Sequence, residues 1–131
     1  MADKVLIIHG KLAGLNDLID AERRHRQAGA RVKKDAEEII RAHIKEQLRG
    51  YRPKTPVTLY YYFYEPNRRR DLDNIAGFAH KVVQDSLVKE GILENDGWEY
   101  VKAFYDSFHV DKDFPRIEIE IVEPDGKGGK P

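Results

Sequence analysis

Cysteine is absent from this chain of 131 residues. A fold held by disulfides is therefore excluded, and so is a zinc site built on thiolates. Long apolar runs are absent too, so we expect no membrane span, and the start MADKVLIIHG is too short and too soon interrupted for a signal peptide. Together these absences predict a soluble protein of the reducing cytoplasm.

The chain also lacks an excess of charge of either sign, because 23 Lys and Arg residues balance 23 Asp and Glu residues and the net charge is zero. The distribution is nevertheless uneven, since residues 22–34 contain six basic residues and one acid. Such a cluster is a candidate surface for phosphate groups, and the alternative is an ordinary solvated helix face. This basic cluster consists of Arg23, Arg24, Arg26, Arg31, Lys33 and Lys34.

Four segments have the character of β-strands. The run KVLIIH, ended by Gly10, predicts the first, and VTLYYYFYE at residues 57–65 predicts the second because β-branched and aromatic residues dominate it. The runs YVKAFYDSFHV and RIEIEIVE predict two more near the C-terminal end, and the second of them alternates between apolar and polar residues.

Helical spacing of apolar residues is found in two other segments. Residues 15–48 predict one broken helix or two, with Gly29 as the expected interruption. From Ile75 to Leu87 the apolar residues recur as the stripe of an amphipathic helix that stops near Gly91.

The length suits a single domain, which we place at residues 1–123 with a flexible tail at residues 124–131. The order of the predicted elements indicates an α+β fold with two layers. We expect a small mixed or antiparallel sheet with the helices packed on one face.

The segment RRRDLDN places two carboxylates, Asp71 and Asp73, between a predicted strand and a predicted helix. They converge on one side only if the strand continues through them. Two carboxylates this close repel each other, and Mg²⁺ would offset their charge while keeping waters for a substrate. The alternative is that Asp73 caps the helix while Asp71 pairs with a neighbouring arginine.

Asp96 lies in the loop ENDGW, and we expect this loop to return to the same strand-end edge as the two acids. The alternative is a simple turn. We also expect Trp98 to pack the loop against the body of the protein. Lys81 lies on the polar side of the predicted helix, where most lysines are solvated.

The run RRRDLDNIAGFAHKVVQDSLVKEGILENDGW resembles the signature of the RusA family of Holliday junction resolvases. The motif R-D-x-D-N opens it, and the segment GKLAGLNDLI is similar to the first strand and loop of the family, with Asn16 matching. The likeness extends from about Val5 to Val122. The later matching residues, in the expected order, are Lys81, Asp85, Leu87, Gly91, Ile92 and Asp96.

The resemblance implies a homodimeric, Mg²⁺-dependent endodeoxyribonuclease that resolves four-way DNA junctions by paired symmetric nicks in recombination and repair, in a bacterium or a phage-infected cell. Mn²⁺ is expected to substitute for Mg²⁺. By the same resemblance, Asp71, Asp73 and Asp96 are the metal-binding, catalytic acids and Lys81 is an accessory cation. A phage or prophage origin is also implied.

Two departures from the family pattern concern Lys81 and Asn95. Lys81 follows Asp73 by eight residues, whereas the best-known motif places the lysine one helical turn after the second acid. Either an additional turn moves Lys81 about 6 Å further along the helix, or Gly77 opens the first turn and Lys81 regains its place. At Asn95 the family often has another Asp.

Hydrolysis of a phosphodiester needs an activated water and neutralised charge, which carboxylate-bound metal supplies. Arg68, Arg69 and Arg70 are then expected to hold the DNA backbone beside the acids, together with Asn16 and the basic cluster. The alternative is that these arginines merely neutralise the acids. Three other functions remain: a branched-DNA nuclease of looser specificity, a non-catalytic nucleic-acid-binding protein, and a phosphohydrolase of small nucleotides.

Overall fold

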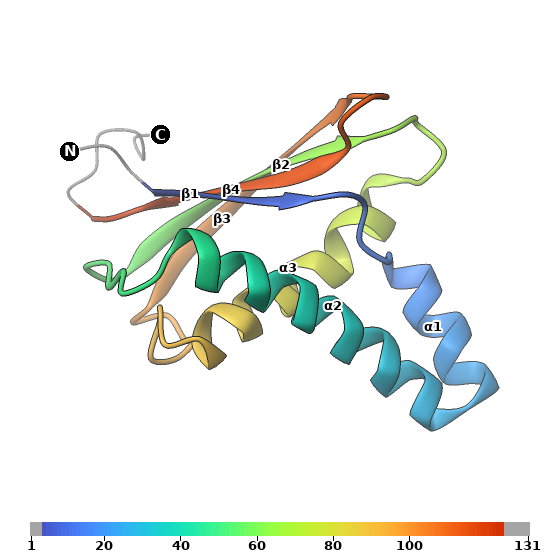
Figure 1. The fold of residues 1–131 in the computed structure, drawn as a ribbon, viewed down its shortest axis with the longest axis horizontal. Coiled ribbons are helices and arrows are strands. Elements are labelled where there is room, and N and C mark those ends of the chain that lie inside the picture. Colours follow the sequence, from blue (N-terminus) through green and yellow to red (C-terminus); the bar gives the residue numbers. More distant parts are fainter. Residues whose placement is uncertain (1–3, 125–131) are drawn as a thin grey trace.

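The computed structural model describes residues 4–124. It has a four-stranded sheet and three helices, and all three helices lie on one face of the sheet (Figure 1). The predicted α+β fold is thus confirmed, while the predicted tail, apart from Pro124, lies outside the described residues. In chain order the elements are β1 (Lys4–His9), α1 (Leu15–Arg24), α2 (Arg26–Gln47), β2 (Val57–Glu65), α3 (Leu72–Lys89), β3 (Val101–Val110) and β4 (Arg116–Val122).

The sheet is mixed, with the strand order β1-β4-β2-β3. β2 pairs with β3 in parallel, whereas β4 pairs with both β1 and β2 in antiparallel fashion. Val57 lies opposite Val101, and Glu65 lies opposite Val110. Because parallel strands need a crossover, the chain leaves β2 at one end of the sheet and enters β3 at the other, with α3 as the connection.

The core lies between the sheet and the helices. Alternate residues of β2 face the helices, and Leu59, Tyr61 and Phe63 are each at most 1% exposed. Burying a large apolar side chain of this kind contributes about 1.5–3 kcal/mol. Burial also raises the pKa of Tyr61, so that its hydroxyl stays protonated. No helix within residues 4–124 is long and apolar enough to cross a membrane.

The break between α1 and α2 is at His25, so the predicted interruption at Gly29 was wrong. His25 has an extended backbone, with φ −169° and ψ 134°, and its Nδ1 accepts a hydrogen bond from the Gln27 amide at 3.1 Å. This contact caps α2. Gly29 is buried within α2, where an added Cβ would lie 2.4 Å from Cγ of Glu22, so it allows α1 and α2 to pack closely.

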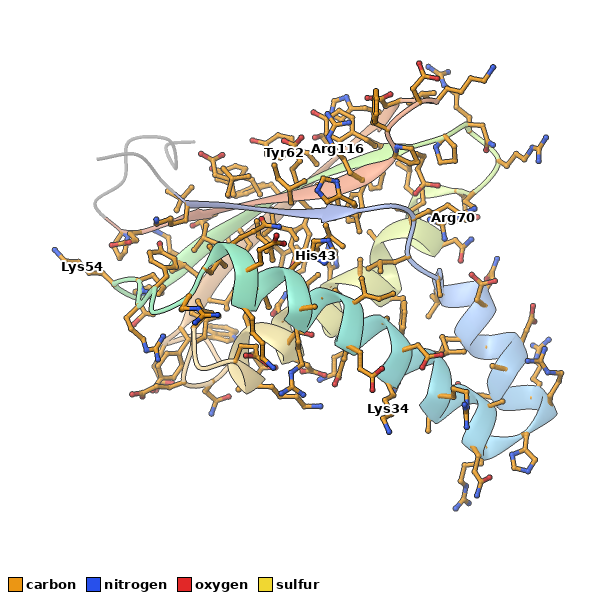
Figure 2. All side chains as sticks on the ribbon, in the orientation of Figure 1. Lys34, His43, Lys54, Tyr62, Arg70 and Arg116 are labelled. Carbon is orange, nitrogen blue, oxygen red and sulfur yellow. The ribbon has the colours of Figure 1, made fainter. Side chains whose placement is uncertain are left out.

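The two edge strands have different surroundings. At β1, the side chain of Gln47 accepts a hydrogen bond from the Ile7 amide and donates one to the Ile7 carbonyl, both at 2.8 Å. His43, also on α2, accepts from the His9 amide at 3.3 Å (Figure 2). α2 therefore covers the β1 edge against pairing with another strand. β3, at the other edge, exposes most of its side chains.

Candidate functional site

Asp71 and Asp73 lie at the N-terminus of α3 rather than in a continued strand. Asp71 is the N-cap residue, and its Oδ1 accepts a hydrogen bond from the Asn74 amide at 2.9 Å. Asp73 is in the first turn, and both side chains are exposed. β2 therefore does not continue through them, although Asp71 itself keeps an extended backbone, with φ −78° and ψ 170°, before the helix begins. The helix dipole, which favours negative charge at this end, offsets part of their repulsion instead.

Asn74 joins this site to the loop before α1. It is buried, and its Oδ1 accepts a hydrogen bond from the Asn16 amide at 2.7 Å. Gly14 makes the approach possible, because an added Cβ would lie 2.5 Å from the same oxygen. Asn16 thus lies beside the start of α3, close to the two acids. Sequence reasoning assigned no role to Asn74, although the residue stands inside the R-D-x-D-N motif.

The three arginines before Asp71 differ in their surroundings. The Arg70 guanidinium donates two hydrogen bonds to the Glu65 carboxylate, at 2.7 and 3.1 Å, and a third to the Leu12 carbonyl at 3.1 Å (Figure 2). Only 15% of its side chain is exposed, whereas Arg68 and Arg69 are exposed. Arg70 therefore fixes the loop geometry, and the other two face solvent. Neither this role nor that of Glu65 was foreseen.

A pocket of about 430 Å³ opens beside Asp71, between the start of α3 and the end of β3. One wall is apolar and includes Leu72, Phe108 and Val110. Arg68 lies on the polar side. The site therefore combines exposed carboxylates and a guanidinium with an apolar depression.

Asp96 lies at the opposite end of the molecule from Asp71 and Asp73. The loop that carries it ends at Tyr100, whose carbonyl accepts a hydrogen bond from the Val57 amide, at the start of β2. Asp71 follows the other end of this nine-residue strand, which spans about 26 Å. The expectation that the loop with Asp96 returns to the sheet edge beside Asp71 and Asp73 of the same chain was therefore wrong. Among residues 4–124, no group of three His, Cys, Asp or Glu side chains is placed to hold a metal ion.

Trp98 does not pack this loop against the body, so that prediction was also wrong. Its side chain is 94% exposed. With Asp96, Gln84 and Phe104 it lines a shallow groove of about 380 Å³. The exposed rings of Trp98 and Phe104 thus give this groove an apolar lining beside Asp96.

Lys81 is also remote from the two acids. α3 is continuous from Leu72 to Lys89 through Gly77, so the alternative in which Gly77 opens the first turn was wrong. Eight residues of helix separate Lys81 from Asp73 by about 12 Å along the axis. The Lys81 ammonium lies 3.3 Å from Asp85 and remains largely exposed.

The basic cluster lies on the same end of the molecule as Asp71 and Asp73. α1 begins at Leu15, where the next residue, Asn16, contacts the start of α3, and runs away from α3 for ten residues, or about 15 Å, to the corner with α2 (Figure 1). The six basic side chains occupy this corner and the first turns of α2, and all are exposed. Lys34 is labelled there in Figure 2. α1 therefore lies between the basic cluster and the start of α3.

No curated protein matches the chain. The model of the family described as Endodeoxyribonuclease RusA matches residues 21–122, a range that includes the basic cluster, Asp71, Asp73, Lys81 and Asp96. Because the match covers most of the sequence, this chain belongs to the RusA family of Holliday junction endodeoxyribonucleases.

Proposed function

We propose that this endodeoxyribonuclease cuts four-way DNA junctions by Mg²⁺-dependent hydrolysis, with Asp71 and Asp73 holding the metal ion. The proposal rests on one observation above all. Two exposed carboxylates stand at the N-terminus of α3, on the same end of the molecule as two exposed arginines and the basic cluster.

The two carboxylates suit Mg²⁺, which proteins commonly hold through one or two carboxylates together with waters and substrate phosphates. Asp71 uses Oδ1 for the helix cap. Its other oxygen and the exposed Asp73 carboxylate remain for a cation. When bound, the metal would supply an activated water and neutralise charge on the phosphoryl group.

The basic residues would bring the DNA to these acids. Arg68 and Arg69 precede Asp71 and face solvent, so their guanidiniums can hold phosphates next to the site. The basic cluster would bind the same DNA further along α1. Arg70, paired with Glu65, would act by fixing the loop that orients Asp71. Without these cations the acids would repel the substrate.

A four-way junction contains two equivalent strands to be cut, so we further propose that the protein acts as a homodimer. A two-fold symmetric dimer presents two identical sites to a substrate with the same symmetry. Each site would make one nick, and the paired nicks would be symmetric.

The test is cleavage of an end-labelled four-way junction in Mg²⁺, beside linear duplex and a 5′-flap of the same sequence. We expect symmetric nicks in the junction, none in the duplex, and restoration by Mn²⁺ after chelation. Comparable cleavage of the flap would favour the branched-DNA nuclease of looser specificity. Binding of the junction without cleavage in either metal would contradict the proposal.

Asp73→Asn and Glu46→Gln form the matched pair of variants for this test. Both remove one exposed carboxylate, but Glu46 lies on α2, outside the candidate site. Cleavage should be lost in the first and kept in the second.

A further inference from the structure

A second group of basic residues lies where α2 and α3 both end. Lys45 is in the last turn of α2, and Arg49 and Arg52 follow in the segment that leads to β2. All three are exposed, and all three line one pocket of about 310 Å³, together with the buried side chains of Ile44 and Leu48. We name Lys45, Arg49 and Arg52 the helix-end surface.

Positive charge is in excess at the helix-end surface. Among the described residues that line the pocket, the one carboxylate is that of Glu90, which is only 12% exposed and accepts a hydrogen bond from Arg41 at 2.6 Å. The Lys45 ammonium lies 3.8 Å from the same carboxylate. Within residues 4–124, no acid forms an ion pair with Arg49 or Arg52. The charges of these two guanidiniums are therefore not neutralised by the chain.

The ends of α2 and α3 offer another role for cations, because basic side chains near a helix C-terminus interact favourably with its dipole. Lys45 and Lys89 fit this role, since each lies in the last turn of its helix. Arg49 and Arg52 come after α2 has ended, and Arg52 donates a hydrogen bond to the Tyr51 carbonyl at 2.9 Å. The helix dipoles therefore account for the lysines better than for the two arginines.

The helix-end surface is far from both Asp71 and the basic cluster. Asp71 caps the start of α3, whose 18 residues span about 27 Å before the helix ends beside the pocket. The basic cluster lies at the start of α2, which has 22 residues and is about 33 Å long. Lys54, two residues after Arg52, projects from this far end of the molecule (Figure 2). Since phosphates of one DNA strand are about 3.4 Å apart, 27 Å corresponds to about eight nucleotides.

We propose that the helix-end surface binds the sugar-phosphate backbone of a junction arm, at phosphates separate from those held by Arg68 and Arg69. This inference rests on the proposed function, because it takes DNA as the partner, and it adds a second region of contact. Cations around a pocket raise the local concentration of anions, and a guanidinium can hold a phosphate through two parallel hydrogen bonds. A contact with phosphate adds affinity without base preference.

The salt dependence of junction binding tests this contact without any cleavage. Arg49→Gln should lower the slope of log K against log salt concentration by about 1, and its combination with Arg52→Gln by about 2. Binding is measured in a chelator, so that no metal contributes. Lys112→Gln is the matched control, because it also removes one exposed cation, between β3 and β4. Its slope should equal that of wild type.

Ethylation interference identifies the phosphates that each pair of arginines contacts. An ethylated phosphate has lost its charge, so modification at a contacted position excludes that strand from the complex. Wild type should show two sets of such phosphates. Arg49→Gln with Arg52→Gln should lose one set, and Arg68→Ala with Arg69→Ala should lose the other. Loss of the same set in both pairs of variants would overturn a separate surface.

Melting temperatures distinguish DNA binding from stabilisation of the helix ends. We expect Arg49→Gln with Arg52→Gln to keep the melting temperature of wild type, because neither arginine pairs with a buried acid. A lower melting temperature with an unchanged salt slope and interference pattern would assign the two arginines to the helix ends and overturn the proposal.

The helix-end surface and the proposed function can fail separately. If wild type nicks the junction while Arg49→Gln with Arg52→Gln keeps the wild-type slope, only the helix-end surface is refuted. If wild type contacts both sets of phosphates but nicks nothing in Mg²⁺ or Mn²⁺, only the proposed function is refuted. Failure of wild type to bind the junction would overturn both.

Discussion

The Glu65 carboxylate, on the last residue of β2, receives two hydrogen bonds from Arg70, the residue that precedes Asp71. Glu65 is only 7% exposed, so this ion pair is largely removed from water. Arg70 also donates to the Leu12 carbonyl, and thereby ties the loop before α1 to the start of α3.

Arg70→Ala should lower the free energy of unfolding by about 3 kcal/mol, because it leaves the Glu65 carboxylate buried and unpaired. Urea unfolding measures this loss. Arg68→Ala is the control, since its side chain is exposed, and should be neutral in stability. Equal stability of the two variants would contradict the structural role of Arg70.

Arg68→Ala combined with Arg69→Ala should weaken junction binding and leave unfolding unchanged. If each arginine neutralises one phosphate, the slope of log K against log salt concentration should fall by about 2. Titrations of labelled junction at several salt concentrations measure that slope. An unchanged slope would mean that neither guanidinium contacts the DNA backbone.

Two substitutions at Asp71 separate its helix cap from its proposed metal contact. Asp71→Asn keeps a good N-cap and should retain stability, whereas Asp71→Ala should cost about 1 kcal/mol. Both should lose cleavage, because neither keeps the carboxylate. Thermal unfolding and single-turnover cleavage are compared on the same preparations. Wild-type cleavage by Asp71→Asn would show that Asp71 only caps α3.

Gly14→Ala should destabilise the protein by about 1–3 kcal/mol, because the new methyl group overlaps the Asn74 side chain and carbonyl. Junction cleavage should fall as well, since Asn16 and α3 would be pushed apart. Gly77→Ala is the matched control, because its methyl meets only the side chain of Leu15, at 3.3 Å. Melting temperatures that fall equally in both variants would contradict the close contact at Gly14.

The elements with strong local signals were predictable from the sequence. β2 is rich in β-branched and aromatic residues, and the stripe of α3 has helical spacing, so both were placed to within a few residues. The break between α1 and α2 was misplaced at Gly29, because His25 caps a helix through a ring nitrogen rather than through one of the usual small polar side chains.

The position of Asp96 could be predicted only by knowing whether β2 and β3 pair in parallel or antiparallel fashion. An antiparallel pair joined by a helix could bring the Asp96 loop back to the Asp71 edge, whereas the parallel pair carries it to the far end. The partner of Arg70 was hidden for a similar reason, because sequence spacing does not show which carboxylate is buried beside it. Trp98 was assigned to the core, since an apolar residue looks alike whether it packs within a chain or between chains.

The metal site at the start of α3 is tested by single-turnover cleavage of a four-way junction in Mg²⁺, with wild type, Asp73→Asn and Glu46→Gln side by side. Asp73→Asn should bind the junction but nick it about 10³-fold more slowly, because metal-assisted charge stabilisation is worth several kcal/mol, while Glu46→Gln should match wild type. Equal cleavage by wild type and Asp73→Asn would contradict a metal site at the start of α3.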